Sequence, residues 1–111
     1  MKEPQFVTFS ELPFRPLNER VSSRFIAGDQ LMYVEHRAKK GHRAINDQHV
    51  NEQLSLVVSG SLRVTIANKV YTLKPGDALL IPSNVVHTVE VLEDSVVIEV
   101  FSPPRNEWLS K

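Results

Sequence analysis

Hydrophobic and polar residues alternate with a period of two in several parts of the chain. The clearest case is Leu62, Val64 and Ile66, which are separated by the polar residues Arg63 and Thr65. Successive side chains of a β-strand point to opposite faces, so this pattern places the apolar side chains on one face and the polar ones on the other. The alternation therefore predicts a half-buried strand.

Similar apolar stretches follow one another along the chain and are separated by turn signals. The turn signals lie at residues 59–61, 67–69 and 74–77, and the last contains the Pro-Gly pair of a type II turn. Strands are expected at residues 31–37, 54–58, 62–66, 70–73, 78–81, 85–91 and 96–101. Roughly seven or eight short strands at a spacing of about 8–12 residues predict an all-β antiparallel sandwich or barrel.

Residues 1–20 differ from the rest of the chain because they are rich in proline and phenylalanine. We expect an extended N-terminal arm that packs its aromatic rings on the barrel or on a partner subunit. Residues 21–111 are then the single barrel domain. Near the C-terminus, Pro104 suits the first position of one helical turn within residues 103–111.

Composition and charge narrow the functional classes. The 111 residues suit one domain, and 41% hydrophobic with 23% charged residues is typical of a globular protein. Thirteen basic residues balance 13 acidic ones, which argues against a nucleic-acid partner. There is no cysteine, and no uncharged stretch is long enough to cross a membrane. Glu3 and Pro4 interrupt any apolar signal segment, so we expect a cytoplasmic protein.

Two polar residues occupy apolar strands. His87 begins a strand and shares a face with Val89 and Val91, which points its ring into the interior. It is either a hydrogen-bonded core histidine or a metal ligand. Glu99 lies inside an apolar run, so it must be paired, protonated or used in chemistry, with Arg105 as a candidate partner.

A further polar segment covers residues 47–53. In an extended chain, one face would carry a carboxylate, an imidazole and two amides, from Asp47, His49, Asn51 and Gln53. These groups form a plausible oxygen and nitrogen ligand set for a metal ion, although a solvated strand edge would look the same.

The other two histidines have no spacing argument behind them. His36 lies among Glu35, Arg37 and two lysines, which indicates a solvated strand face. His42 is near Asp47 in the sequence and could be a spare ligand.

The glycines, proline and polar residues combine into two longer patterns. Residues 41–60 read G-x5-D-x-H-x3-Q-x6-G, and residues 76–87 read G-x5-P-x4-H. These patterns resemble the two motifs of the cupin family, in which Asp47 replaces a histidine, Gln53 a glutamate and Asn84 a glycine. The resemblance covers residues 31–101 and implies a jelly-roll barrel that binds one divalent metal ion, for which Ni, Zn, Mn and Fe are candidates. It implies Asp47, His49, Gln53 and His87 as the ligands.

The C-terminal segment, residues 93–109, resembles that of the small cupins of pectin degradation. Those proteins convert cyclic unsaturated uronates into linear keto forms. The resemblance implies catalytic roles for Glu99 and Arg105, with Phe101, Arg105 and Asn51 contacting the substrate.

We therefore expect a metal-binding cupin that isomerises a small sugar acid by proton transfer next to the metal. Two alternatives stay open, a non-catalytic cupin that binds a small molecule and a metal-dependent dioxygenase of the quercetinase type. Because a small sandwich has edge strands that need cover, and the arm could cross to a second copy, we also expect a homodimer.

Overall fold

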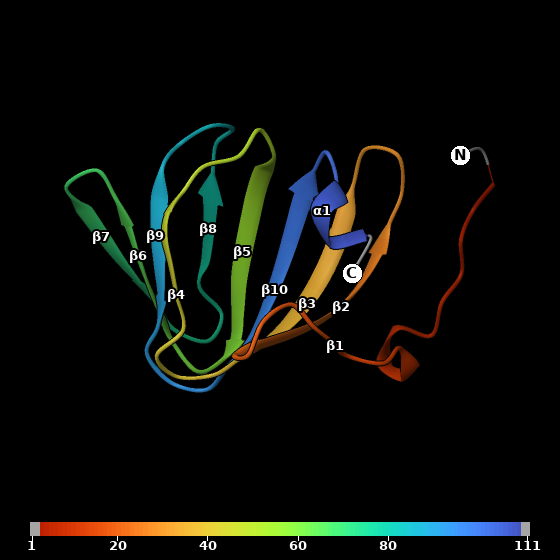
Figure 1. The fold of residues 1–111 in the computed structure, drawn as a ribbon, viewed down its shortest axis with the longest axis horizontal. Coiled ribbons are helices and arrows are strands. Elements are labelled where there is room, and N and C mark those ends of the chain that lie inside the picture. Colours follow the sequence, from red (N-terminus) through yellow and green to blue (C-terminus); the bar gives the residue numbers. More distant parts are fainter. Residues whose placement is uncertain (1–2, 110–111) are drawn as a thin grey trace.

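The structure, a computed structural model, describes residues 3–109, whose regular elements are almost all β-strands (Figure 1). The strands are β1 (Arg15–Pro16), β2 (Val21–Ala27), β3 (Met32–Ala38), β4 (Arg43–Asp47), β5 (Glu52–Ser59), β6 (Leu62–Ile66), β7 (Lys69–Leu73), β8 (Ala78–Ile81), β9 (His87–Val91) and β10 (Ser95–Ser102). A 3-10 turn, η1 (Phe9–Glu11), precedes them, and a short helix, α1 (Asn106–Leu109), follows. The predicted all-β class is confirmed.

The strands form two sheets that pack face to face. The larger sheet has the order β1-β2-β3-β10-β5-β8, and the smaller sheet has the order β4-β9-β6-β7. Every neighbouring pair is antiparallel. Because β10 lies between β3 and β5, residues far apart in the sequence become neighbours on the inner face of the larger sheet.

All seven predicted strands are present, and β1, β2 and β4 are additional. The helical turn expected after Pro104 is also present, but it begins at Asn106. Within residues 3–109, no helix has both the length and the hydrophobicity that a membrane crossing requires.

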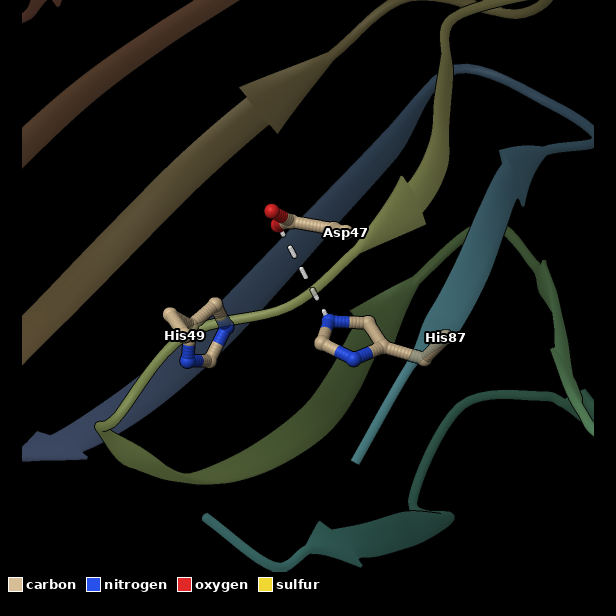
Figure 2. Close-up of side chains that lie close together, drawn as sticks. All are labelled: Asp47, His49 and His87. Carbon is tan, nitrogen blue, oxygen red and sulfur yellow. Dashed lines mark ion pairs between the residues drawn. The ribbon is translucent and has the colours of Figure 1, made fainter. Parts of the chain in front are cut away.

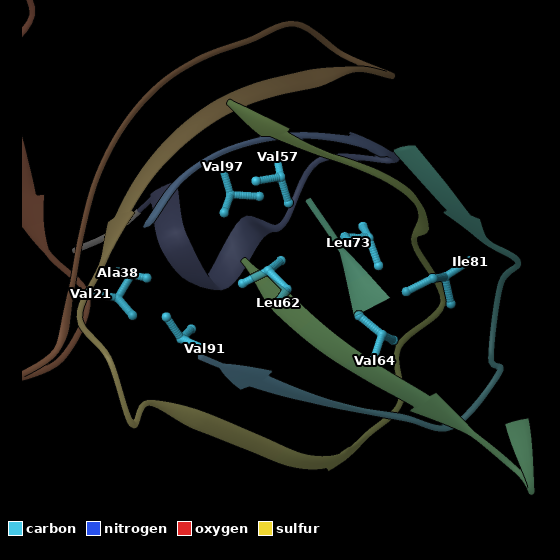
Figure 3. Close-up of a cluster of buried hydrophobic side chains, with 9 residues drawn as sticks. All are labelled: Val21, Ala38, Val57, Leu62, Val64, Leu73, Ile81, Val91 and Val97. Atoms are coloured by element: carbon cyan, nitrogen blue, oxygen red, sulfur yellow. The ribbon is translucent and has the colours of Figure 1, made fainter. Parts of the chain in front are cut away.

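The hydrophobic core fills the space between the two sheets (Figure 3). It consists of Val21, Ala38, Val57, Leu62, Val64, Leu73, Ile81, Val91 and Val97. A second cluster, Met32, Val34 and Phe101, lies under Trp108 of α1. The rows of inward-facing β-branched side chains follow from the period-two pattern of the strands.

One turn between the sheets depends on a glycine. Gly60 connects β5 to β6 at φ +86°, and a Cβ atom there would lie 2.1 Å from the hydroxyl oxygen of Ser95. Only glycine combines this backbone angle with such close packing. The last glycine of the first motif is therefore required by the backbone.

The N-terminal arm runs along the outer face of the larger sheet. Its last residues form β1, which pairs with β2. Phe14 lies 4.4 Å from the guanidinium of Arg24 and 4.0 Å from that of Arg37, and Phe9 meets Tyr33 edge to face. Before η1 the chain stays in contact with the end of β2, where Gln5 Nε2 donates to the carbonyl of Ala27 over 3.2 Å, and Phe6 is 91% exposed.

Candidate metal centre and cavity

Three potential metal ligands converge where β4 ends and β9 begins (Figure 2). Asp47 pairs with His87 in the register of β4 and β9, and His49 follows shortly after β4. One ligand atom from each of Asp47, His49 and His87 can be chosen so that all lie within 4.8 Å of one another. Oδ2 of Asp47 lies 3.9 Å from Nε2 of His87.

The backbone fixes the tautomer of both imidazoles. Nδ1 of His49 lies 2.9 Å from the carbonyl oxygen of Asn51, and Nδ1 of His87 lies 2.9 Å from that of Val85. A carbonyl oxygen can only accept a hydrogen bond, so each Nδ1 carries a proton and donates it. In the neutral rings Nε2 is then left with a lone pair, which is the usual arrangement of a metal-binding histidine.

Gln53 completes a set of donors that fits a metal ion. Its Oε1 lies 3.1 Å from Nε2 of His49, while its Nε2 donates to Ser55 and Glu99. Oε1 of Gln53 and Nε2 of the neutral His49 ring, which both carry lone pairs, therefore face each other. A cation bound to both atoms would satisfy the contact, as would a second proton on His49. Two imidazoles, a carboxylate and an amide oxygen are a chemically suitable set for a divalent transition metal.

The turn that presents His87 uses a residue with positive φ. Asn84 adopts φ +63°, and its backbone N–H donates to the carbonyl of His49 over 2.8 Å. Asparagine tolerates this left-handed conformation better than most residues, so it can stand in the turn where the family motif has glycine.

Glu99 lies next to the metal centre at the middle of β10. Its Oε1 is 2.8 Å from Nε2 of His36, and its Oε2 accepts hydrogen bonds from Ser55 Oγ at 2.6 Å and Gln53 Nε2 at 2.7 Å. Burial by itself raises the pKa of Glu99. The hydrogen bond and charge of His36, with smaller effects of Ser55 and Arg105, outweigh burial and hold the pKa below its usual value. Glu99 is therefore ionised at neutral pH.

A cavity of about 300 Å³ lies next to both the candidate metal centre and Glu99. Its polar lining includes Asp47, His87, Gln53, Glu99 and Arg105. The rest is largely apolar and is contributed mainly by the core, through Val21, Ala38, Leu62, Val89, Val91 and Val97. A pocket of this kind, apolar with a few converging polar groups, is typical of a small-molecule site.

Residues 34–102 match the Cupin domain family. The chain belongs to the cupin family. Among solved structures it is similar to KdgF from Halomonas sp., with 28% identity, a TM-score of 0.86, and 94% of this chain and 99% of the other covered. It also resembles an RmlC-like cupin from Shewanella frigidimarina, with 22% identity, a TM-score of 0.86, and 96% of both chains covered.

A more distant likeness extends to an oxalate decarboxylase variant from Bacillus subtilis. The identity is 23% and the TM-score 0.76, over 89% of this chain and 29% of the decarboxylase. A comparison with curated protein sequences finds no match. The predicted single-domain cupin is thus confirmed, together with its jelly-roll fold.

His36 of this cupin lies in a different place from the one expected. The predicted solvated position is wrong, because His36 is 7% exposed, lines the cavity and sits between Ser23 and Glu99. The charged neighbours Glu35 and Arg37 misled the prediction, since adjacent residues of a strand point to opposite faces. The pattern Met32, Val34, His36 and Ala38, with apolar residues at every second position, was the signal that could have found it.

Asn51 and His42 complete the set of residues considered from the sequence. Asn51 is buried, and its Nδ2 donates to the carbonyls of Pro103 at 2.6 Å and Pro104 at 3.2 Å, so the substrate contact expected of it stays a prediction. It anchors the segment before Arg105. His42 lines the cavity, and burial followed by the charges of His36 and Arg20 lowers its pKa.

Arg105 reaches the cavity from the loop before α1. Its guanidinium lies 4.4 Å from the ring centre of Trp108 and 5.2 Å from that of Phe101. Its Nε donates to Glu107 over 2.6 Å. The expected ion pair of Arg105 with Glu99 is not the main contact of Glu99, whose direct partner is His36.

Proposed function

We propose that this cupin binds one divalent metal ion through Asp47, His49, Gln53 and His87 and linearises a small unsaturated uronate beside it. The proposal depends on one observation, the convergence of nitrogen and oxygen donors at a cavity that also holds Glu99 and Arg105. The resemblance of residues 93–109 to the cupins of pectin degradation suggests the substrate class, and the likeness to KdgF supports it.

Opening the ring of such a uronate is a proton-transfer reaction without a change in redox state. A proton leaves the hemiacetal hydroxyl, and the bond from that carbon to the ring oxygen breaks. The enol formed from the ring oxygen and the adjacent alkene then takes up a proton on carbon and becomes the keto form. A divalent ion bound at the centre would act as a Lewis acid that stabilises negative charge on a substrate oxygen.

The chain's own residues would perform the other steps. Glu99 is ionised and lines the cavity, so its carboxylate can accept the hydroxyl proton and return it to carbon. The planar fork of Arg105 matches a carboxylate and would hold that of the substrate. Phe101 and Trp108 pack against the guanidinium, which limits its motion, and Phe101 would shape the wall of the site.

The direct test is turnover of unsaturated galacturonate by the metal-loaded protein, followed as loss of the absorbance of the conjugated alkene. Activity is expected for the wild type and is expected to be lost in His87→Ala and Glu99→Gln. Glu90→Gln is a matched control, because Glu90 forms its ion pairs with Arg63 and Arg43 away from the cavity. No turnover of any uronate by a metal-loaded wild type would contradict the substrate assignment.

The apolar lining of the cavity favours one second candidate, a metal-dependent dioxygenase of the quercetinase type. That function predicts oxygen consumption in the presence of an aromatic substrate, which the uronate isomerase would not show. A non-catalytic binding protein is the third candidate. It predicts that the purified protein contains no metal and that its melting temperature does not change on addition of Mn²⁺, Ni²⁺, Fe²⁺ or Zn²⁺.

We further propose that the protein is a homodimer. The outer faces of β5 and β8 expose Leu54, Val58 and Leu80, which are 41%, 50% and 57% accessible, and Phe6 of the arm is also exposed. Exposed apolar groups of this kind are typical of subunit contacts. Size-exclusion chromatography with light scattering is expected to give twice the chain mass, and a species of 12.6 kDa would contradict the proposal.

A further inference from the structure

A continuous chain of buried polar side chains crosses the inner face of the larger sheet. It begins at Ser23 on β2, passes through His36 on β3 and Glu99 on β10, and ends at Ser55 and Gln53 on β5. These four strands are consecutive neighbours in the sheet. The contacts are 2.5 Å from Ser23 Oγ to His36 Nδ1, 2.8 Å from His36 to Glu99, and 2.7 Å from Gln53 to Glu99.

The end of this chain determines which atom of the Gln53 amide faces the metal centre. Nε2 of Gln53 donates to Ser55 Oγ at 2.9 Å and to Glu99 Oε2, so Oε1 is turned toward His49. A flipped amide would place its oxygen against the ionised carboxylate of Glu99 and its N–H groups toward the metal. An amide nitrogen that carries two protons has no lone pair for a metal, whereas the oxygen has two. Only one of the two orientations can therefore bind an ion.

The other side chains of this hydrogen-bonded series hold Glu99 in place. His36 donates to Oε1 of Glu99 through Nε2, which leaves Nδ1 to accept from the hydroxyl of Ser23 when the ring is neutral. Ser55 donates to Oε2 and at the same time accepts from Gln53. Every polar side-chain atom of this hydrogen-bonded series except Oε1 of Gln53 thus has a partner within the series, and Oε1 is left to face the metal centre.

We propose that Glu99 and Ser55, supported by His36 and Ser23, are positioning residues that hold the carbonyl oxygen of Gln53 toward the metal. This inference rests on the proposed metal centre and gives Glu99 a task in addition to proton transfer. Partners that orient metal ligands commonly change metal affinity about 10–100-fold when they are removed.

The test is a double-mutant cycle read out as the Kd for Mn²⁺, measured from the electron paramagnetic resonance signal of the free ion. Ser55→Ala keeps every charge of the site and is expected to weaken Mn²⁺ binding about 10-fold. In Gln53→Ala there is no amide left to orient. Adding Ser55→Ala to Gln53→Ala is therefore expected to leave the Kd of that variant unchanged.

Two controls separate orientation from charge and from folding. Glu35→Gln removes a carboxylate on the outer face of β3 and is expected to bind Mn²⁺ like the wild type. Thermal melting of each metal-free variant checks that it is folded. An equal loss of affinity from Ser55→Ala in both backgrounds, or no loss in either, would overturn the inference while the metal centre stands. A wild type that binds no Mn²⁺ would overturn both.

Discussion

Replacing Gly60 with alanine tests whether the first motif is required by the backbone. The added Cβ would lie 2.1 Å from Ser95 Oγ, 2.6 Å from the carbonyl oxygen of Asp94 and 2.7 Å from Ser95 Cα. Two of these three atoms belong to the backbone and cannot rotate away. The left-handed conformation costs alanine about 1–2 kcal/mol, and overpacking adds about 1–3 kcal/mol. The free energy of unfolding is therefore expected to fall by about 2–5 kcal/mol.

Gly76→Ala is the matched control. Gly76 has a similar φ of +92°, but a Cβ there would meet no atom within 4 Å. The free energy of unfolding of Gly76→Ala should fall only by the conformational cost, about 1–2 kcal/mol. Urea unfolding of both variants followed by circular dichroism gives the two values. If Gly60→Ala were no more destabilising than Gly76→Ala, the argument from close packing at Ser95 and Asp94 would be refuted.

Two further predictions concern the polar groups around the cavity. Because the folded-state pKa of Glu99 is lowered, its stabilising effect is present above the unfolded pKa of about 4.3 and is lost as the pH falls through the folded value. The difference in unfolding free energy between wild type and Glu99→Gln should therefore shrink in acid, and a difference independent of pH would contradict this. Asn51→Ala removes the hydrogen bonds to Pro103 and Pro104 and should cost about 1–3 kcal/mol. By loosening the segment before Arg105 it should also raise KM for the uronate more than it lowers kcat, and unchanged kinetics would show that this segment does not position Arg105.

The fold was predictable because its signal is local. Alternating apolar residues identify most strands, and the glycine and proline positions identify the turns between them. Strand β4, Arg43–Asp47, was not predicted because its five residues include only two apolar ones, Ala44 and Ile45. Strand β2 was not predicted because its inward positions include the polar residue Ser23, whose hydroxyl is hydrogen-bonded to Nδ1 of His36.

The site was predictable only for residues that lie at the fixed spacings of the two motifs. Asp47 and His87 meet because β4 pairs with β9, and the two motifs carry that register. The partnership of His36 with Glu99 spans 63 residues and depends on the register of β3 and β10, which no local pattern encodes. Asn51 turns toward Pro103 and Pro104 instead of sharing a face with Asp47, because the chain between β4 and β5 is not a strand and side chains there do not alternate between two faces.

The central claim is that the imidazoles of His49 and His87 bind one metal ion together. Elemental analysis and X-ray absorption spectroscopy of the purified protein test this claim directly. The account predicts one divalent ion for each chain, with two imidazole nitrogens at about 2.0–2.1 Å if the ion is zinc. A protein that takes up no divalent ion, or binds one without imidazole ligands, would contradict it.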